Sequence, residues 1–263
     1  MKKRGEERDK DNRSINTSAV ICVGFRFKNE KIFHTTQNVA HYFMEKWSVD
    51  TIITELRKYK NPKNVAGMAR FGINPKNTLG VSIPTLRALA KTIGKNHGLV
   101  QQLWKSGIHE GKILAALIDE PMFVTEKQMD RWVRDFDSWD VCDQVCMNLF
   151  DKMPNAFAKA KEWTSHNPEY ERRAGFAMMA ALAVHDKKAT DKDFLQFFPL
   201  IEKYADDQRN FVKKAVNWAL RQIGKRNQTL CKRAITVSER LKQSKSKSAR
   251  WIGSDAFREL CRK

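Results

Sequence analysis

The sequence predicts an all-α protein. No segment alternates apolar and polar residues with period two over five residues, as a half-buried strand would. Apolar residues instead recur at the three- and four-residue spacing of amphipathic helices, and helix-capping residues separate one such stretch from the next. With 263 residues, the chain is long enough to bury a sizeable core.

The chain divides into two regions by composition. Residues 1–45 begin with "MKKRGEERDKDNRS" and are expected to be a charged, poorly ordered extension, in which "FRFKNEKIF" forms an isolated hairpin or nothing ordered. Residues 46–263 are the predicted helical domain. Its first helix is expected in "VDTIITELRKYK", because Ser48 and Asp50 offer an N-cap.

Capping residues mark the helices in the middle of the chain. Thr125 and Gln128 form a capping-box pattern ahead of "EKQMDRWVRDF". Asp137 or Ser138 is expected to cap the next helix, which ends near Asp151.

Four further signals place the later helices. Pro154 and Pro168 each suit the first turn of a helix. Thr190 and Asp191 precede one helix predicted in "KDFLQFFPLIEKYA". The helix "QRNFVKKAVNWALRQIG" is expected to end with Gly224 as its C-cap.

These helices come in pairs with short links. The second helices of successive pairs are expected to start near residues 139, 168 and 208, which gives a unit of about 30 to 40 residues. This period is typical of HEAT-like two-helix repeats, which form a curved stack whose second helices line a concave wall. A globular helical bundle remains the alternative on periodicity alone.

The charge of the chain indicates a polyanionic partner. It has 49 Lys and Arg against 30 Asp and Glu, a net charge of +19, and a pI near 9.8. Charge of this size favours nucleic acid, although a membrane surface or an acidic protein would also fit, and its spread along the chain favours a basic concave face.

No apolar stretch reaches the length of a membrane span, and "AVICVGF" (19–25) is too short and too late for a secretory signal, so we expect a soluble, cytoplasmic protein.

The cysteines and histidines predict no disulfide framework and no metal site. The five cysteines are an odd, scattered set, and Cys142 and Cys146 are interpreted as reduced core thiols. The six histidines lack ligand spacing and are interpreted as surface or core residues. The "QSKSKSAR" stretch (243–250) is interpreted as a solvated loop, with phosphate contact as the alternative.

Two tryptophans lie off the apolar stripes of their predicted helices. Trp139 and Asp143 share a face that points away from the stripe formed by Val141, Cys142, Val145 and Leu149. Trp218 likewise lies off its stripe, beside Lys214 and Arg221 in projection. Aromatic side chains next to charged groups suit contact with a base or a sugar-phosphate edge. Alternatively, the rings pack against neighbouring repeats, and Asp143 only complements its helix N-terminus.

The same residues resemble a known family. "SWDVCDQV" with Trp139 and Asp143, "ERRAGFAMMAAL" with Arg173, and "FVKKAVNWALRQIGKRN" with Trp218 are similar to the AlkD-like alkylpurine DNA glycosylases, whose N-terminal repeat is similar to residues 64–95. The resemblance covers about residues 48–245. One departure is that Ile83 precedes Pro84 where a capping hydroxyl is expected.

The resemblance implies an enzyme that excises cationic N3- and N7-alkylated purines from duplex DNA, without a base-flipping pocket, a metal or a cofactor, and as a monomer. Trp139 and Trp218 would contact the lesion nucleotide and Asp143 would be the catalytic carboxylate. Arg173 would hold the DNA backbone. Lys213, Lys214 and Arg221 are further candidates for contacts to phosphate.

The chemistry suits these residue types. An alkylated purine cation is already a good leaving group, so one ionised carboxylate can stabilise the developing oxocarbenium ion and position water. Two other functions stay open. One is a non-catalytic HEAT-like scaffold for nucleic acid, and the other is a solenoid that binds acidic proteins.

Overall fold

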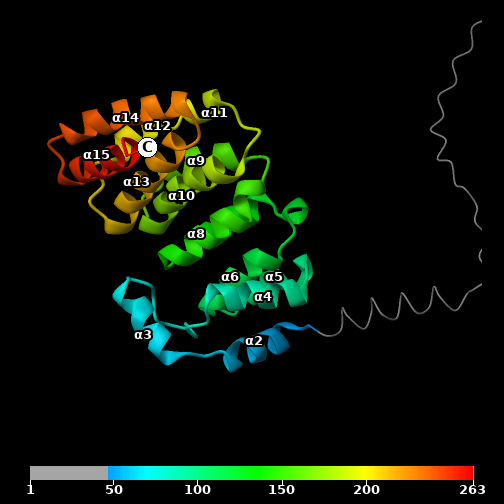
Figure 1. The fold of residues 1–263 in the computed structure, drawn as a ribbon. Coiled ribbons are helices and arrows are strands. Elements are labelled where there is room, and N and C mark those ends of the chain that lie inside the picture. The colour runs from blue at the N-terminus through cyan, green and yellow to red at the C-terminus, as the bar shows by residue number, and fades with distance from the viewer. Residues whose placement is uncertain (1–46, 263) are drawn as a thin grey trace, which may run out of the picture. The chain divides into compact units, whose positions relative to one another are not determined.

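In the computed structural model, residues 47–262 are described, and all their regular elements are helices (Figure 1). The predicted all-α class is confirmed for this range, whereas the predictions for residues 1–45, including the "AVICVGF" stretch, lie outside it. None of the described helices is long and apolar enough to cross a membrane.

The described helices are short and closely spaced along the chain. The bounds are α2 Val49–Lys58, α3 Pro62–Arg70, α4 Ile83–Ile93, α5 His97–Lys105, α6 His109–Ile118, α7 Glu126–Arg134, α8 Trp139–Asn148, α9 Ala156–Thr164, α10 Glu169–His185, α11 Asp191–Leu195, α12 Phe198–Tyr204, α13 Asn210–Gly224, α14 Gln228–Lys242 and α15 Lys247–Leu260, with 3₁₀ turns η1 Pro121–Phe123 and η2 Phe150–Lys152.

Helix pairs stack in sequence order. The second helices α6, α8, α10, α13 and α15 form one row, in which each packs against the next, and α5, α9 and α14 pack against their partners α6, α10 and α15. Figure 1 shows α8, α10 and α13 following one another in this row. The predicted repeat of helix pairs is therefore confirmed, and its second helices start at residues 139, 169 and 210.

Several predicted helix starts are confirmed by their caps. The Ser48 hydroxyl accepts a hydrogen bond from the Thr51 N–H, and the Thr125 hydroxyl accepts one from the Gln128 N–H. The Gln128 side chain does not complete a capping box, because its amide donates to Asp119 instead. The cap missing before Pro84 is Ser82, one residue before Ile83, which is the first residue of α4.

Other predicted boundaries are corrected. Gly224 is not a C-cap but the last residue of α13, because Lys225 follows in the right-handed helical region. The single helix predicted after Asp191 is broken into α11 and α12, and Pro199 lies in the first turn of the second. Pro168 is the N-cap of α10, not a residue of its first turn, and Pro154 precedes α9.

The core runs through the whole stack. The predicted apolar stripes of α8 and α13 are fully buried, and so are the free thiols of Cys142 and Cys146, as expected for core cysteines. The "QSKSKSAR" stretch is only partly a loop, because Ser246 caps α15 and Ser248 is buried. This packing fixes α8, α10 and α13 relative to one another, and these three helices carry the candidate residues.

Candidate functional site

The first turn of α8 is held by the loop between α3 and α4. Ser138 is the N-cap residue of α8, but its hydroxyl accepts a hydrogen bond from the Asn74 N–H, at 2.9 Å, and not from its own helix. The Asn74 side chain donates to Asp137, and the Trp139 indole N–H donates to the Phe71 carbonyl at 3.1 Å. The orientation of Trp139 is therefore set by a segment nearly 70 residues earlier in the chain.

Asp143 faces Arg173 across the contact between α8 and α10. Arg173 donates two hydrogen bonds to the carboxylate, from Nε to Oδ1 at 3.0 Å and from Nη2 to Oδ2 at 2.7 Å. Its Nη1 donates to the Phe211 carbonyl at the start of α13. The side chains of Asp143 and Arg173 are only 14% and 6% exposed. Such a bidentate, charge-assisted pair fixes both groups in one geometry.

Burial and charge act against each other in this pair. Burial raises the pKa of the Asp143 carboxyl above its ordinary value, while Arg173 acts to lower it. Burial alone would lower the pKa of the Arg173 guanidinium, but the charge of Asp143 raises it. Because the guanidinium stays protonated and donates two hydrogen bonds, we infer an ionised carboxylate at neutral pH.

The two tryptophans occupy different surroundings. Trp139 is partly exposed, and its ring lies 5.9 Å from the guanidinium carbon of Arg173. Trp218 is exposed to the same intermediate degree, and its ring packs against the core. The contacts described for residues 47–262 thus join Trp139, Asp143 and Arg173 into one cluster and leave Trp218 outside it. The expected contact of Trp218 with the lesion nucleotide stays a prediction.

The four candidate DNA-binding cations also differ from one another. Arg173 is buried and bonded to protein groups, so it has little surface to offer a phosphate. Arg221 is paired with Glu259. Lys213 lies 5.0 Å from the ring of Trp251, and Lys214 is exposed. The expected contact between Arg173 and the DNA backbone stays a prediction, and its guanidinium is already bonded to Asp143.

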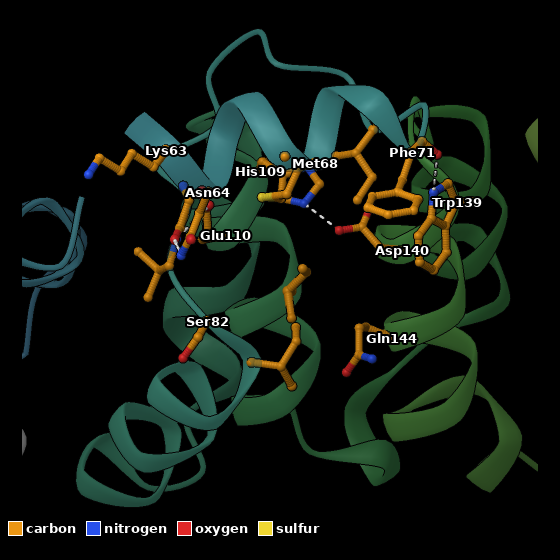
Figure 2. A pocket seen from close by; sticks show the side chains of 16 residues that line it. Lys63, Asn64, Met68, Phe71, Ser82, His109, Glu110, Trp139, Asp140 and Gln144 are labelled. Atoms are coloured by element: carbon orange, nitrogen blue, oxygen red, sulfur yellow. Dashed lines mark hydrogen bonds and ion pairs between the residues drawn. The ribbon is translucent and has the colours of Figure 1, made fainter. Parts of the chain in front are cut away.

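Trp139 also lines a cavity of about 470 Å³. It lies between α3, α6 and the start of α8, and Figure 2 shows Met68, Phe71, Trp139, His109 and Gln144 around it. Its lining is mainly apolar. The cavity forms because α3 spans this space without burying a side chain in it. The expectation of excision without a base-flipping pocket stays a prediction.

One wall of the cavity holds a buried histidine–carboxylate pair. His109 Nε2 lies 2.8 Å from Asp140 Oδ2, and the His109 side chain is only 3% exposed. Burial would lower the pKa of His109, but the hydrogen bond with Asp140 raises it above the usual value. The sequence led to the interpretation of this histidine as a surface or core residue. The available signal was a His–Glu pair at the start of a mainly apolar helix. The N-cap residue of this helix, Ile108, has no side chain that can cap it.

Glu110 shapes the same wall by binding backbone. Its buried carboxylate accepts hydrogen bonds from the N–H groups of Leu79, Gly80 and Val81, at 2.6–3.1 Å. Gly80 has φ +81°, and a Cβ there would come within 2.3 Å of the Asn61 carbonyl. The loop that holds α8 is therefore itself fixed to α6.

Comparison with known proteins assigns the family. The sequence model described as "DNA alkylation repair enzyme" matches residues 52–260. The chain belongs to this family. The match extends beyond the region of resemblance seen in the sequence, to the end of α15.

A solved structure supports the fold of this DNA alkylation repair family member. It is described as "A new family of proteins related to the HEAT-like repeat DNA glycosylases with affinity for branched DNA structures". The two chains share 17% sequence identity with a TM-score of 0.68, over 81% of this chain and 95% of that one. The HEAT-like architecture is thereby confirmed. None of the curated proteins matches the sequence.

In this DNA alkylation repair family member, the predicted site residues thus separate into groups. Trp139, Asp143 and Arg173 meet at the junction of α8 and α10, while Trp218 lies farther along α13. His109 and Asp140 are bonded to each other and line the cavity that Trp139 also lines.

Proposed function

We propose that this protein is a DNA glycosylase that hydrolyses the N-glycosidic bond of cationic N3- and N7-alkylated purines in duplex DNA. The observation that carries the proposal is the Asp143 carboxylate, held by Arg173 beside the partly exposed Trp139. Membership of the DNA alkylation repair family and the net charge of +19 support DNA as the partner.

The reaction needs one carboxylate and one water. The bond between C1′ and the purine nitrogen breaks, and its electron pair neutralises the cationic base, which leaves. The sugar develops positive charge, which an ionised Asp143 stabilises, while water adds to C1′ and gives up a proton. Each carboxylate oxygen keeps a lone pair beyond the one that Arg173 uses, so Asp143 can still orient that water.

Arg173 serves as a positioning residue in this mechanism. A carboxyl group buried alone takes up a proton and loses the charge that the reaction needs. The guanidinium keeps Asp143 ionised and fixes its direction, and Trp139 offers an aromatic face to the cationic nucleotide. Lys213 and Lys214 are proposed to contact phosphate.

The test is single-turnover excision of N7-methylguanine from a duplex by wild type and by Asp143→Asn. Loss of the charge should slow excision by about 10²–10³-fold, with little change in affinity for the same duplex. The substitution also leaves Arg173 buried without its partner, which should cost about 3–5 kcal/mol of stability. Both proteins must therefore be assayed well below the unfolding temperature of the variant.

A double variant separates stability from chemistry. Asp143→Leu with Arg173→Met replaces the ion pair by apolar side chains, a change that is often neutral or stabilising. The expected double variant is folded, binds duplex and does not excise. Excision at the wild-type rate by either variant would remove Asp143 from the mechanism.

A second candidate function is non-catalytic binding of branched DNA. The related fold is described with that affinity, and the full engagement of Asp143 by Arg173 is compatible with a purely structural pair. Tighter binding to a four-way junction than to linear duplex, together with no excision of any cationic lesion, would favour it.

A further inference from the structure

The loop after α3 reaches across the stack to α13. In segment 71–74, Phe71 and Asn74 are hydrogen-bonded to the start of α8. Gly72 of the same segment lies against the ring of Phe211 at the start of α13, so closely that a Cβ on Gly72 would collide with the ring tip, Cζ. Layers of a repeat stack touch mainly their nearest neighbours. This segment instead joins the two helices that pack on either side of α10.

Helix α10 holds Phe211 on its other sides. The Phe211 N–H donates a hydrogen bond to the Glu169 carboxylate at 3.3 Å, and the Phe211 carbonyl accepts one from Arg173 Nη1 at 2.6 Å. The Phe211 ring stacks on Tyr170, with 5.8 Å between the ring centroids. Phe211 is therefore confined between Gly72 and α10, and a displacement of its ring tip would also displace its backbone.

The Phe211 carbonyl fixes the plane of the Arg173 guanidinium. This group is planar and rigid, so the directions of its N–H groups are set relative to one another. Nη1 binds the carbonyl, while Nε and Nη2 bind the two carboxylate oxygens of Asp143. A shift of the carbonyl would therefore tilt the guanidinium away from the geometry in which both of these oxygens are bonded.

We propose that Phe211 is a positioning residue for the Arg173–Asp143 pair. Its ring is kept in place by Gly72, so the loop after α3 acts on the carboxylate through α13. The same loop holds the indole of Trp139 and thus supports both the aromatic ring and the carboxylate of the candidate site. The effect on the carboxylate follows from these contacts alone, whereas the effect on excision rests on the proposed glycosylase function.

The chain offers two matched glycines for the test. Gly72 and Gly107 are each the second residue after a helix, α3 and α5 respectively, with φ of +79° and +67°. Alanine is strained in this backbone conformation at both positions. Only at Gly72 does the added Cβ collide with a ring, because at Gly107 its nearest neighbour is Asn77 Nδ2 at 3.7 Å, an ordinary contact. Gly72→Ala therefore displaces Phe211, and Gly107→Ala is the control for backbone strain.

The first readout is the titration of the Asp143 carboxyl, which does not depend on excision. Carboxyl-carbon NMR of aspartate-labelled protein follows this titration, and the signal missing from Asp143→Asn assigns it. Burial raises the pKa of this carboxyl and the Arg173 charge acts to lower it, while Asp140 of the same helix acts to raise it. Gly72→Ala should therefore titrate at higher pH than wild type, since a displaced guanidinium lowers the pKa less. Gly107→Ala should titrate like wild type.

A shorter side chain at position 211 separates the collision from other effects. Leucine lacks the ring tip that a Cβ on Gly72 would meet. Phe211→Leu alone should raise the pH of the Asp143 titration, because the contact with Gly72 and the stacking on Tyr170 are both lost. Adding Gly72→Ala to this variant should change nothing further, which is the non-additivity expected of residues in contact. Phe211→Leu also provides the test if Gly72→Ala does not fold.

The second readout is single-turnover excision of N7-methylguanine at saturating duplex. Gly72→Ala should excise about tenfold or more slowly than Gly107→Ala, because a misplaced catalytic group loses rate without losing substrate affinity. Its rate should also fall at a higher pH as the solution is acidified, in step with the titration of Asp143. Duplex affinity should equal that of Gly107→Ala.

The outcomes separate the two proposals. An Asp143 titration that is unchanged in Gly72→Ala, or equally shifted in Gly107→Ala, overturns the positioning role and leaves the glycosylase proposal standing. A further shift when Gly72→Ala is added to Phe211→Leu does the same. A titration that shifts in Gly72→Ala and Phe211→Leu but not in Gly107→Ala, in a protein whose wild type excises nothing, supports the positioning role and overturns the glycosylase.

Discussion

At the scale of single residues, the contacts of Asp143 explain why its carboxylate lies off the apolar stripe of α8. It is paired with Arg173, whose guanidinium carbon also lies 5.9 Å from the centre of the Trp139 ring. The same contacts satisfy a structural requirement and a chemical one. The guanidinium neutralises a charge that burial disfavours, and it keeps that charge present for the proposed reaction, which develops a cation.

The environment of Asp143 predicts an acid limb in the pH profile of excision. In the proposed reaction the reactive form is the carboxylate, and burial raises the pKa of this carboxyl above its ordinary value of 3.8. The rate should therefore be full above the raised pKa and fall as pH decreases through it, at a higher pH than an ordinary aspartate would give. A pH profile of single-turnover excision, with unfolding monitored at each pH, measures this. The residual excision rate of Asp143→Asn should show no such decrease at acid pH.

Part of this site follows from sequence, and part does not. The four-residue spacing of Trp139 and Asp143 places them on one face whatever the tertiary structure is. The pairing of Asp143 with Arg173 depends on how α8 packs against α10, which no local pattern encodes. The sequence therefore could not show that Arg173 pairs with Asp143, and its expected contact with DNA stays a prediction. The pairing of His109 with Asp140 is equally non-local.

At the scale of helices, starts were predicted better than ends. A capping hydroxyl acts within its own first turn, so Ser48 and Thr125 could be assigned from sequence. Gly224 was misinterpreted because a glycine near a helix end suits both a C-cap and close helix packing. In the structure α14 and α15 pack closely against Gly224. A Cβ at this position would lie 2.8 Å from Ala234 and 2.9 Å from Leu260.

The same substitution should therefore have opposite effects in two helices. Alanine stabilises a helix interior by about 0.5–1 kcal/mol relative to glycine. Gly67→Ala should raise the melting temperature, because its Cβ meets nothing. Gly224→Ala should lower it, because overpacking typically costs about 1–3 kcal/mol. Calorimetric unfolding of both variants provides the comparison, and a stabilised Gly224→Ala would contradict the packing described for α13.

At the scale of the whole molecule, the charge of +19 should dominate binding to undamaged DNA. Each phosphate contact contributes about 0.9 to the slope of log affinity against log salt concentration. Lys214→Gln should reduce this slope by about one, because Lys214 is exposed on α13. Lys127→Gln, an equally simple loss of exposed charge on α7, is the control and should leave the slope unchanged. Equal slopes for the two variants would show that α13 makes no phosphate contact through Lys214.

The hydrogen bonds of Arg173 also bear on how the stack comes apart. In a linear array of repeats, each layer is stabilised mainly by contacts with its nearest neighbours. Unfolding can therefore begin at either end and proceed one layer at a time. Arg173 belongs to α10 but binds Asp143 of α8 and the Phe211 carbonyl of α13. Three consecutive layers thus share one buried cation, and none of them can detach without leaving that cation partly unsatisfied. The middle of the array should therefore melt as a single cooperative block, while fraying stays confined to the outer pairs.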